Sequence, residues 1–393
     1  MRTPHGILIG VLALSPAVAL TSVATSADAA VATCHGRVVT LFGTSGDDTI
    51  IGTPLPDVVQ LGAGDDTFTD LGGDDVVCGG PGADTIDGGA GNDLLDGGAG
   101  RDKIAGGEGN DTVLGGDGND ELTGGAGNDR VNGGKGDDYI AEDLGNDKVG
   151  GGPGKDFVTY LFVRSPIRVR NAREVFGAGH DVLSAVETIE GTPLGDVMRG
   201  SRRGDDLRGG GGPDRIEGLG GNDIIFAYGG TATGGPGNDF IQASGRTRAL
   251  GGAGSDEIVL DKGFTTARGG ADPDSFRIIS VDARGSIDGQ GAANQLNMAS
   301  FRRGVTVNIG KGFVTWRGGA KVRLRNIDNT LGTKFADTLI GSAGDDYLDA
   351  GRGNDTLRGL GGNDFLVGRG GRDRADGGAG WDICLAERTK ACP

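Results

Sequence analysis

Apolar residues recur at every ninth position over much of the chain, and glycine-rich, acidic segments separate them. From Gly79 to Thr159 the chain is an unbroken series of nine-residue units: GGPGADTID, GGAGNDLLD, GGAGRDKIA, GGEGNDTVL, GGDGNDELT, GGAGNDRVN, GGKGDDYIA, EDLGNDKVG and GGPGKDFVT. The same frame extends back to Gly43, and every unit has Asp at the sixth place and a β-prone apolar residue at the eighth. The last three places of each unit predict a short strand whose middle residue points inward. Such a strict period predicts that each unit stacks on the next.

Glycine occupies the first, second and fourth places of most units. Glycine supplies backbone angles that other residues avoid, so these places indicate a tight loop before each strand. The pattern G-G-x-G-x-D-x-U-x is the known calcium-binding repeat of RTX proteins. The chain therefore resembles the RTX (repeats-in-toxin, hemolysin-type) calcium-binding repeat family, in its secreted bacterial form.

The resemblance implies an all-β fold, a parallel β-roll or right-handed β-solenoid in which two successive units form one coil. Loops on one edge would then be 18 residues apart in this sequence. Each calcium ion would lie between stacked loops and take carboxylate and backbone carbonyl oxygens, which suits a hard cation with about six to eight oxygen ligands. The resemblance places Asp84, Asp102, Asp120, Asp138 and Asp156 on one edge, and Asp93, Asp111, Asp129 and Asp147 on the other.

Two interruptions divide the repeats into three blocks. In the first interruption, the alternation in SPIRVRN predicts a strand with Ile167 and Val169 on one face and Arg168 and Arg170 on the other. SFRRGVTVNIG and LRNIDNTLGTKFADTLIG in the second interruption resemble parts of the first. We predict a signal peptide at 1–29, an N-terminal leader or cap at 30–42, a first block at 43–159, a β insert at 160–190, a degenerate block at 191–277, a second β insert at 278–331, a third block at 332–385 and a C-terminal cap at 386–393.

Several calcium ions are the predicted cofactors, and their predicted ligands are sixth-place aspartates. These are Asp66, Asp75, Asp84, Asp93, Asp102, Asp111, Asp120, Asp129, Asp138, Asp147, Asp156, Asp223, Asp239, Asp256, Asp346, Asp355, Asp364, Asp373 and Asp382. The first four units lose glycines, most clearly at Leu55 and Pro56, so we expect weaker sites there than after Gly79. The eroded middle block predicts patchy calcium occupancy.

The composition is that of an exported acidic repeat protein. Glycine contributes 83 of 393 residues without a three-residue period, which excludes collagen. The formal net charge of −17 disfavours nucleic acid as a partner, because binding phosphates requires clustered positive charge. The run from Ile7 to Leu20, followed by Ala27 and Ala29, predicts a secretory signal that is too short to be a membrane span. We therefore expect a secreted protein without a membrane span.

Four cysteines, Cys34, Cys78, Cys384 and Cys392, come after the predicted signal. An even number in an exported chain favours disulfides, and their positions near the two ends suggest the pairs Cys34–Cys78 and Cys384–Cys392. The first pair requires the segment before Gly43 to fold back over the first coils. Its 44 residues correspond to about 12 Å along the stack, whereas bridged Cα atoms lie about 4.4 to 6.8 Å apart. Free or metal-binding thiols are the alternative.

The repeats are the feature of this sequence that indicates a function. The chain lacks the H-E-x-x-H motif of zinc proteases, the G-x-S-x-G motif of serine hydrolases and the G-x-x-x-x-G-K phosphate loop. We expect no catalysis, and interpret the chain as a secreted protein whose folding is driven by calcium and whose role is structural, adhesive or in surface interaction. We expect folding to need calcium because the burial of one apolar side chain per unit offsets little of the conformational entropy that nine residues lose when they become ordered. The alternative is a carbohydrate-active enzyme or an accessory module of a polysaccharide-modifying system. Basic residues in the inserts either contact a cell-surface polymer or, more simply, form solvated strand faces.

Overall fold

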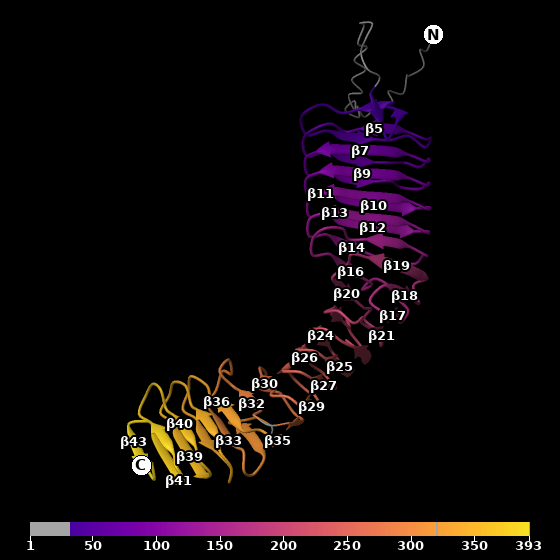
Figure 1. The fold of residues 1–393 in the computed structure, drawn as a ribbon. Helices are drawn as coiled ribbons and strands as arrows, with labels where there is room; N and C mark the ends of the chain where they lie inside the picture. The colour runs from indigo at the N-terminus through magenta and orange to yellow at the C-terminus, as the bar shows by residue number, and fades with distance from the viewer. Residues whose placement is uncertain (1–31, 292, 320, 393) are drawn as a thin grey trace, which may run out of the picture.

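The computed structural model describes residues 32–291, 293–319 and 321–392. Within these ranges the chain forms strands, turns and loops without an α-helix, and successive strands of the repeats alternate between two long sheets (Figure 1). Each repeat strand pairs in parallel with the strand two units away, as Ile104 pairs with Leu122, 18 residues further on. The predicted all-β parallel solenoid is therefore confirmed. The predicted signal peptide at 1–29 lies outside the described residues.

One sheet lies on the inside of two bends and is called the inner sheet; the other is called the outer sheet. In spatial order the inner sheet contains β4 (Thr49–Ile51), β6 (Thr67–Thr69), β8 (Thr85–Asp87), β10 (Lys103–Glu108), β12 (Glu121–Ala126), β14 (Tyr139–Ala141), β16 (Phe157–Thr159), β20 (Thr188–Glu190), β22 (Asp206–Arg208), β24 (Ile224–Ala227), β26 (Phe240–Ala243), β28 (Glu257–Leu260), β30 (Ser275–Ile278), β32 (Gln295–Asn297), β36 (Asn329–Leu331), β38 (Tyr347–Asp349), β40 (Phe365–Val367) and β42 (Ile383–Leu385). The outer sheet contains β3 (Leu41–Phe42), β5 (Val58–Gln60), β7 (Val76–Pro81), β9 (Leu94–Ala99), β11 (Thr112–Asp117), β13 (Arg130–Lys135), β15 (Lys148–Gly150), β19 (His180–Ser184), β18 (Glu174–Phe176), β17 (Arg168–Arg170), β21 (Val197–Arg199), β23 (Asp214–Glu217), β25 (Gly230–Pro236), β27 (Arg248–Ala253), β29 (Thr266–Gly270), β31 (Ser286–Gln290), β35 (Val322–Arg325), β34 (Phe313–Trp316), β33 (Val305–Asn308), β37 (Thr338–Ile340), β39 (Thr356–Gly361), β41 (Arg374–Ala379) and β43 (Arg388–Lys390).

The core is a thin column of apolar side chains between the two sheets. The middle residue of each repeat strand points inward, as the sequence predicts, and Ile86, Leu95 and Ile104 are almost fully buried. Close stacking of the loops depends on glycine at the fourth place. Gly82 has a φ of +148°, and a Cβ there would lie 1.7 Å from the carbonyl oxygen of Gly64 in the preceding coil. The loops are therefore in backbone contact from coil to coil.

Each insert adds two strands to the outer sheet and none to the inner sheet. At the first insert the outer sheet runs β15, β19, β18, β17, β21, with β18 antiparallel to both neighbours. The inner sheet passes directly from β16 to β20. The second insert repeats this arrangement with β31, β35, β34, β33, β37 opposite β32 and β36. The sequence similarity of the inserts therefore corresponds to one shared topology.

The added strands account for the curvature of the molecule. Neighbouring strands lie about 4.7 to 4.9 Å apart, so each insert lengthens the outer sheet by about 10 Å relative to the inner sheet. Figure 1 shows the stack changing direction near β17 to β20 and again between β29 and β36, with the inner sheet on the inside.

Within the first insert, Ile167 and Val169 are buried while Arg168 and Arg170 are exposed, as the alternation predicts.

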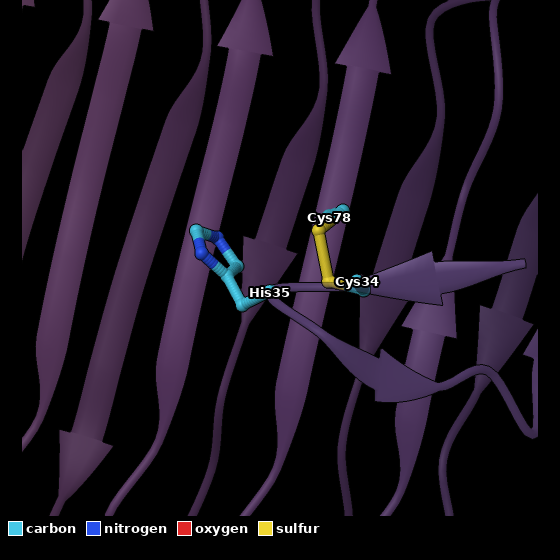
Figure 2. A group of neighbouring side chains, drawn as sticks. All are labelled: Cys34, His35 and Cys78. Carbon is cyan, nitrogen blue, oxygen red and sulfur yellow. A yellow bond between two sulfur atoms is a disulfide. The ribbon is translucent and has the colours of Figure 1, made fainter.

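Both predicted disulfides are present, which removes the alternative of free or metal-binding thiols. The Cα atoms are 5.9 Å apart in Cys34–Cys78 and in Cys384–Cys392. Figure 2 shows the bond between Cys34 and Cys78, with His35 beside it. At the other end, Cys384 packs against the last layer of the core.

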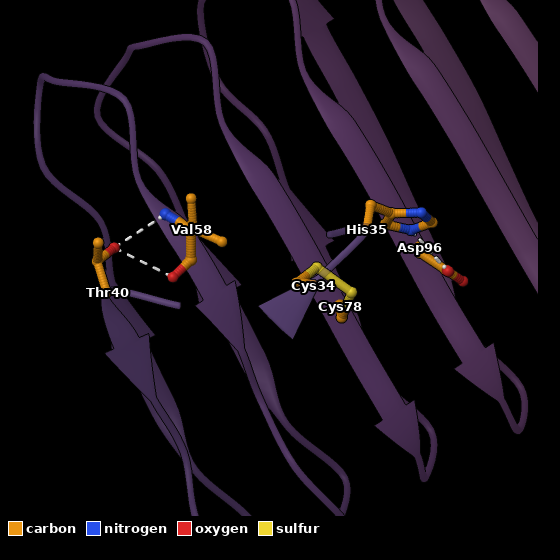
Figure 3. The surroundings of a disulfide bond; sticks show 6 residues. All are labelled: Cys34, His35, Thr40, Val58, Cys78 and Asp96. Atoms are coloured by element: carbon orange, nitrogen blue, oxygen red, sulfur yellow. Dashed lines mark hydrogen bonds and ion pairs between the residues drawn. A yellow bond between two sulfur atoms is a disulfide. The ribbon is translucent and has the colours of Figure 1, made fainter. Parts of the chain in front are cut away.

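The N-terminal segment folds back over the first coils, as the first disulfide requires. Its strands β1 (Thr33–Cys34) and β2 (Arg37–Val38) form a small antiparallel hairpin against the outer sheet. His35 Nε2 lies 2.9 Å from Asp96 Oδ2, and the Thr40 hydroxyl donates to the carbonyl of Val58 (Figure 3). The hairpin thereby lies across the outward face of β5, β7 and β9.

Deleting residues 160–175 is expected to straighten the first bend. The deletion removes β17 and most of β18, and it reduces the 34-residue separation between Asp147 and Asp181 to the regular 18. Small-angle X-ray scattering should then show a larger maximum dimension despite the shorter chain. Deleting residues 103–120, which removes one complete coil, is the control and should only shorten the particle. Unchanged curvature after the first deletion would contradict the explanation that the added outer-sheet strands bend the stack.

Candidate metal sites

The sixth-place aspartates form two buried rows, one along each edge of the solenoid. The inner row precedes inner-sheet strands and contains the predicted ligands Asp66, Asp84, Asp102, Asp120, Asp138, Asp156, Asp223, Asp239, Asp256, Asp346, Asp364 and Asp382. The outer row precedes outer-sheet strands and contains Asp75, Asp93, Asp111, Asp129, Asp147, Asp355 and Asp373. Each of these residues is at most 4% exposed. The structure thus brings the predicted ligands together within each block.

Hydrogen bonds connect the aspartates of one row. The backbone N–H of Asp84 donates to Oδ1 of Asp102 at 2.8 Å, and the same bond recurs from coil to coil. In the middle block the separations shorten to 16 residues between Asp223 and Asp239 and to 17 between Asp239 and Asp256, yet the bonds persist. The eroded sequence therefore keeps the loop geometry of the regular repeats.

The second carboxylate oxygen, Oδ2, is left without a hydrogen-bond partner among the described residues. This is so for every predicted ligand except Asp346. Oδ2 of Asp84 faces Gly79, where a Cβ would lie 2.4 Å from Oδ2 and 2.3 Å from the carbonyl oxygen of Gly97 in the next coil. Buried carboxylate oxygens beside backbone carbonyls form an oxygen-only donor set, which is the kind that calcium prefers. The residues present therefore fit calcium.

A family model describing the RTX calcium-binding nonapeptide repeat matches residues 40–54, 51–86, 79–113, 105–140, 114–149, 123–158, 199–233, 331–366 and 358–388, together more than half of the chain. The chain belongs to this RTX repeat family. Residues 159–198 and 234–330, which include both inserts, lie outside the matched RTX segments. No curated protein matches the chain significantly. The described part of this RTX chain contains no helix long and apolar enough to cross a membrane.

Six RTX loops carry Ser or Thr at the second place instead of glycine: Thr44, Thr53, Thr192, Ser201, Thr333 and Ser342. The backbone N–H of each donates to Oδ2 of the aspartate four residues later. These loops, called capped loops, satisfy their carboxylate with a backbone N–H. Each of the three repeat blocks begins with two capped loops, one on each edge. The sequence indicated that the first units are atypical, but it did not reveal this shared bond.

Asp346 belongs to a capped loop, which explains why it differs from the other predicted ligands. Its Oδ2 accepts the N–H of Ser342. Asp337, at the same place one unit earlier, accepts the N–H of Thr333 at 2.6 Å and the Thr333 hydroxyl at 3.1 Å. Both carboxylates are buried, and both already have donors.

Three aspartates with the same geometry were missed by the sequence analysis. Asp181, Asp214 and Asp274 are at most 3% exposed, and each has an Oδ2 that lacks a partner in the described structure. Asp181 accepts the N–H of Asp147, although 34 residues separate them. FGAGHDVLS, GGGGPDRIE and GGADPDSFR contain these residues at the sixth place. Searching for the nine-residue pattern without a fixed frame would have found them, because Asp181 is out of frame with the first block.

Burial raises the pKa of most carboxyl groups in the two rows, and neighbouring carboxylates add to the effect in several of them. The pKa of Asp93 and Asp102 is raised to about 7, and that of Asp120 to about 6, with burial as the largest cause. Nearby charges in adjacent coils raise these values further, as Asp111 does for Asp93 and Asp138 does for Asp120. Without a cation, the folded rows therefore hold protons near neutral pH.

The raised pKa values predict that acid favours the calcium-free fold. An unfolded Asp has a pKa of about 3.9, so between about pH 4 and pH 7 the folded state binds more protons, and its stability rises as the pH falls through that window. Calcium requires deprotonated ligands, so its stabilising effect should weaken over the same range. Circular dichroism of calcium-free protein should show more strand at about pH 5.5 than at about pH 8. A strand signal that falls with acidification would contradict this prediction.

Proposed function

We propose that this chain is a secreted calcium-binding β-roll protein whose coils fold when calcium binds between stacked loops. The observation that supports this most directly is the pair of buried rows of Oδ2 atoms beside backbone carbonyls. Buried carboxylates require a compensating charge or donor. One row hydrogen bond satisfies Oδ1, and a cation held by the loops compensates Oδ2.

The proposed ligands are the predicted aspartates of the uncapped loops together with Asp181, Asp214 and Asp274. Asp346 has the least capacity for an ion, because Ser342 already occupies its Oδ2. When bound, calcium supplies positive charge between the coils and no redox chemistry. The capped loops complete their own hydrogen bonding, so the proposed calcium dependence belongs to the uncapped loops that come after them.

The proposed role is structural, adhesive or in surface interaction. Disulfides persist in oxidising compartments, so Cys34–Cys78 and Cys384–Cys392 support an extracellular location. The described residues form one solenoid with two strand inserts, an N-terminal hairpin against the outer sheet and a C-terminal strand, β43, that continues this sheet. A role as an accessory module of a carbohydrate-active system stays a prediction from the sequence.

Calcium removal at neutral pH is expected to unfold most of the solenoid. The reason is that the buried carboxyl groups must then either stay charged without a counterion or bind protons at neutral pH, and a core that is only one side chain wide offsets little of either cost. Circular dichroism with calcium and after chelation measures the change, and readdition of calcium should restore the strand signal. Magnesium at the same concentration is the control, because this smaller ion requires near-octahedral geometry. A strand signal that is insensitive to chelation would refute calcium-driven folding.

Substituting one uncapped and one capped aspartate tests which loops bind ions. Asp111→Asn should reduce the number of calcium ions bound per chain in calorimetric titration, because Asp111 Oδ2 lacks a partner in the described structure. Asp337→Asn should leave that number unchanged. It should still destabilise the calcium-loaded protein by about 1.5 to 3 kcal/mol, since hydrogen bonds from Thr333 to a charged group are weakened. Loss of a bound ion in Asp337→Asn but not in Asp111→Asn would show that the assignment of capped and uncapped loops is wrong.

A further inference from the structure

One loop of the outer row carries an acidic residue where the repeat has its first glycine. Glu142 occupies this place in the unit EDLGNDKVG, and its side chain is 3% exposed. Asp147 is the sixth-place residue of the same loop, and Asp181 is the sixth-place residue of the neighbouring loop in the row. One carboxylate oxygen from each of the three residues lies within 4.8 Å of the other two. Three buried carboxylates therefore meet where the first insert joins the first block.

The oxygens of this cluster are unsatisfied. Glu142 Oε1, Asp147 Oδ2 and Asp181 Oδ2 are buried and accept no hydrogen bond from any residue that the structure describes. The hydroxyl of Tyr160 is fully buried and equally without a partner there. Tyr160 occupies the first place one coil after Glu142, and the backbone N–H of Glu142 donates to the carbonyl of Thr159, the residue before Tyr160. Three buried carboxylates and a buried hydroxyl thus lie at this junction, and no Lys, Arg or His of the described residues forms an ion pair with the three carboxylates.

A second loop, near the N-terminal end of the first block, also carries an acidic residue at the first place. Asp70 occupies the first place of the unit DLGGDDVVC, and its carboxylate meets those of Asp75 and Asp57 within 4.8 Å. Asp70 Oδ1 and Asp75 Oδ2 are buried and unpaired within the described structure. Asp57 is in a capped loop and receives the N–H of Thr53. This cluster therefore has less capacity for an ion than the one at Glu142.

We propose that Glu142, Asp147 and Asp181 form a three-carboxylate site for a divalent cation, with Glu142 as a ligand that the ordinary repeat does not possess. The inference rests on the proposed calcium binding by the Asp147 loop, and it adds a charged ligand at a place where the repeat has glycine. Affinity for calcium increases with the number of charged ligands in comparable sites. The ion bound here is therefore held more tightly than ions in the ordinary loops. Since Asp181 belongs to β19, this ion also fastens the first insert to the preceding coil.

Calorimetric calcium titration of the Glu142→Gln variant tests the proposal. Gln keeps the volume of the side chain and removes its charge, so the tightest binding phase should weaken by on the order of tenfold or more. Glu108→Gln is the matched control, because Glu108 is an exposed carboxylate in the same block. Circular dichroism in excess calcium verifies that both variants fold. Equal binding curves for the two variants would overturn the three-carboxylate site and leave the proposed function standing, whereas a wild-type chain that binds no calcium would overturn both.

Terbium luminescence provides a second readout that does not depend on the stability of the Glu142→Gln variant. Terbium occupies calcium sites, and emission excited through tyrosine requires a nearby tyrosine ring. In the wild type, the first equivalents of terbium should therefore be sensitised by Tyr160, and Tyr160→Phe should abolish most of this early emission. Tyr139→Phe, which changes a partly exposed ring on the inner sheet, should abolish much less of it. Identical early emission from the wild type and the Tyr160→Phe variant would contradict a tight site beside Tyr160.

Discussion

The burial of carboxylate charge along two edges is the constraint on which the rest of this structure depends. Parallel stacking at an 18-residue interval places each sixth-place aspartate beside the next, and the backbone N–H of one satisfies Oδ1 of the other. The same stacking removes Oδ2 from water. The core between the sheets is too thin to offset many buried charges, because each repeat strand contributes one inward side chain. The fold therefore requires a partner for each Oδ2.

The residue at the second place decides which partner Oδ2 finds. In capped loops such as the one at Thr192, the backbone N–H donates to the aspartate carboxylate. Most ordinary loops have glycine with a positive φ at this place, as Gly80 does at +119°, and the aspartate Oδ2 lacks a donor among the described residues. One substitution thus separates loops that are complete in themselves from loops that need a cation. The capped pairs stand at the start of each block, where a regular stack has to begin against a different structure.

Features that depend on the local period could be predicted from the sequence, whereas features that depend on distant pairing could not. The frame identified the inward strand residues and the sixth-place aspartates, the family resemblance implied the coil of two units, and the cysteine positions indicated both disulfides. It did not reveal Asp181, because the first insert separates this residue from Asp147 by 34 positions and the repeat seemed to end at Tyr160. The bends were also missed, since reversed strands such as β18 pair according to three-dimensional neighbours and not according to the period.

Glu142 and Tyr160 occupy first places, which carry glycine in most of the repeats. In an ordinary coil the first-place residue faces the aspartate of its own loop, and a Cβ at Gly79 would collide with Asp84 Oδ2. At the insert, β15 still pairs with β19 and β16 with β20, and the two extra strands of the outer sheet lie beyond β19. Glu142 and Tyr160 are both buried at this junction. The row of aspartates therefore continues from Asp147 to Asp181 across the inserted sequence, and Glu142 adds a third carboxylate beside them.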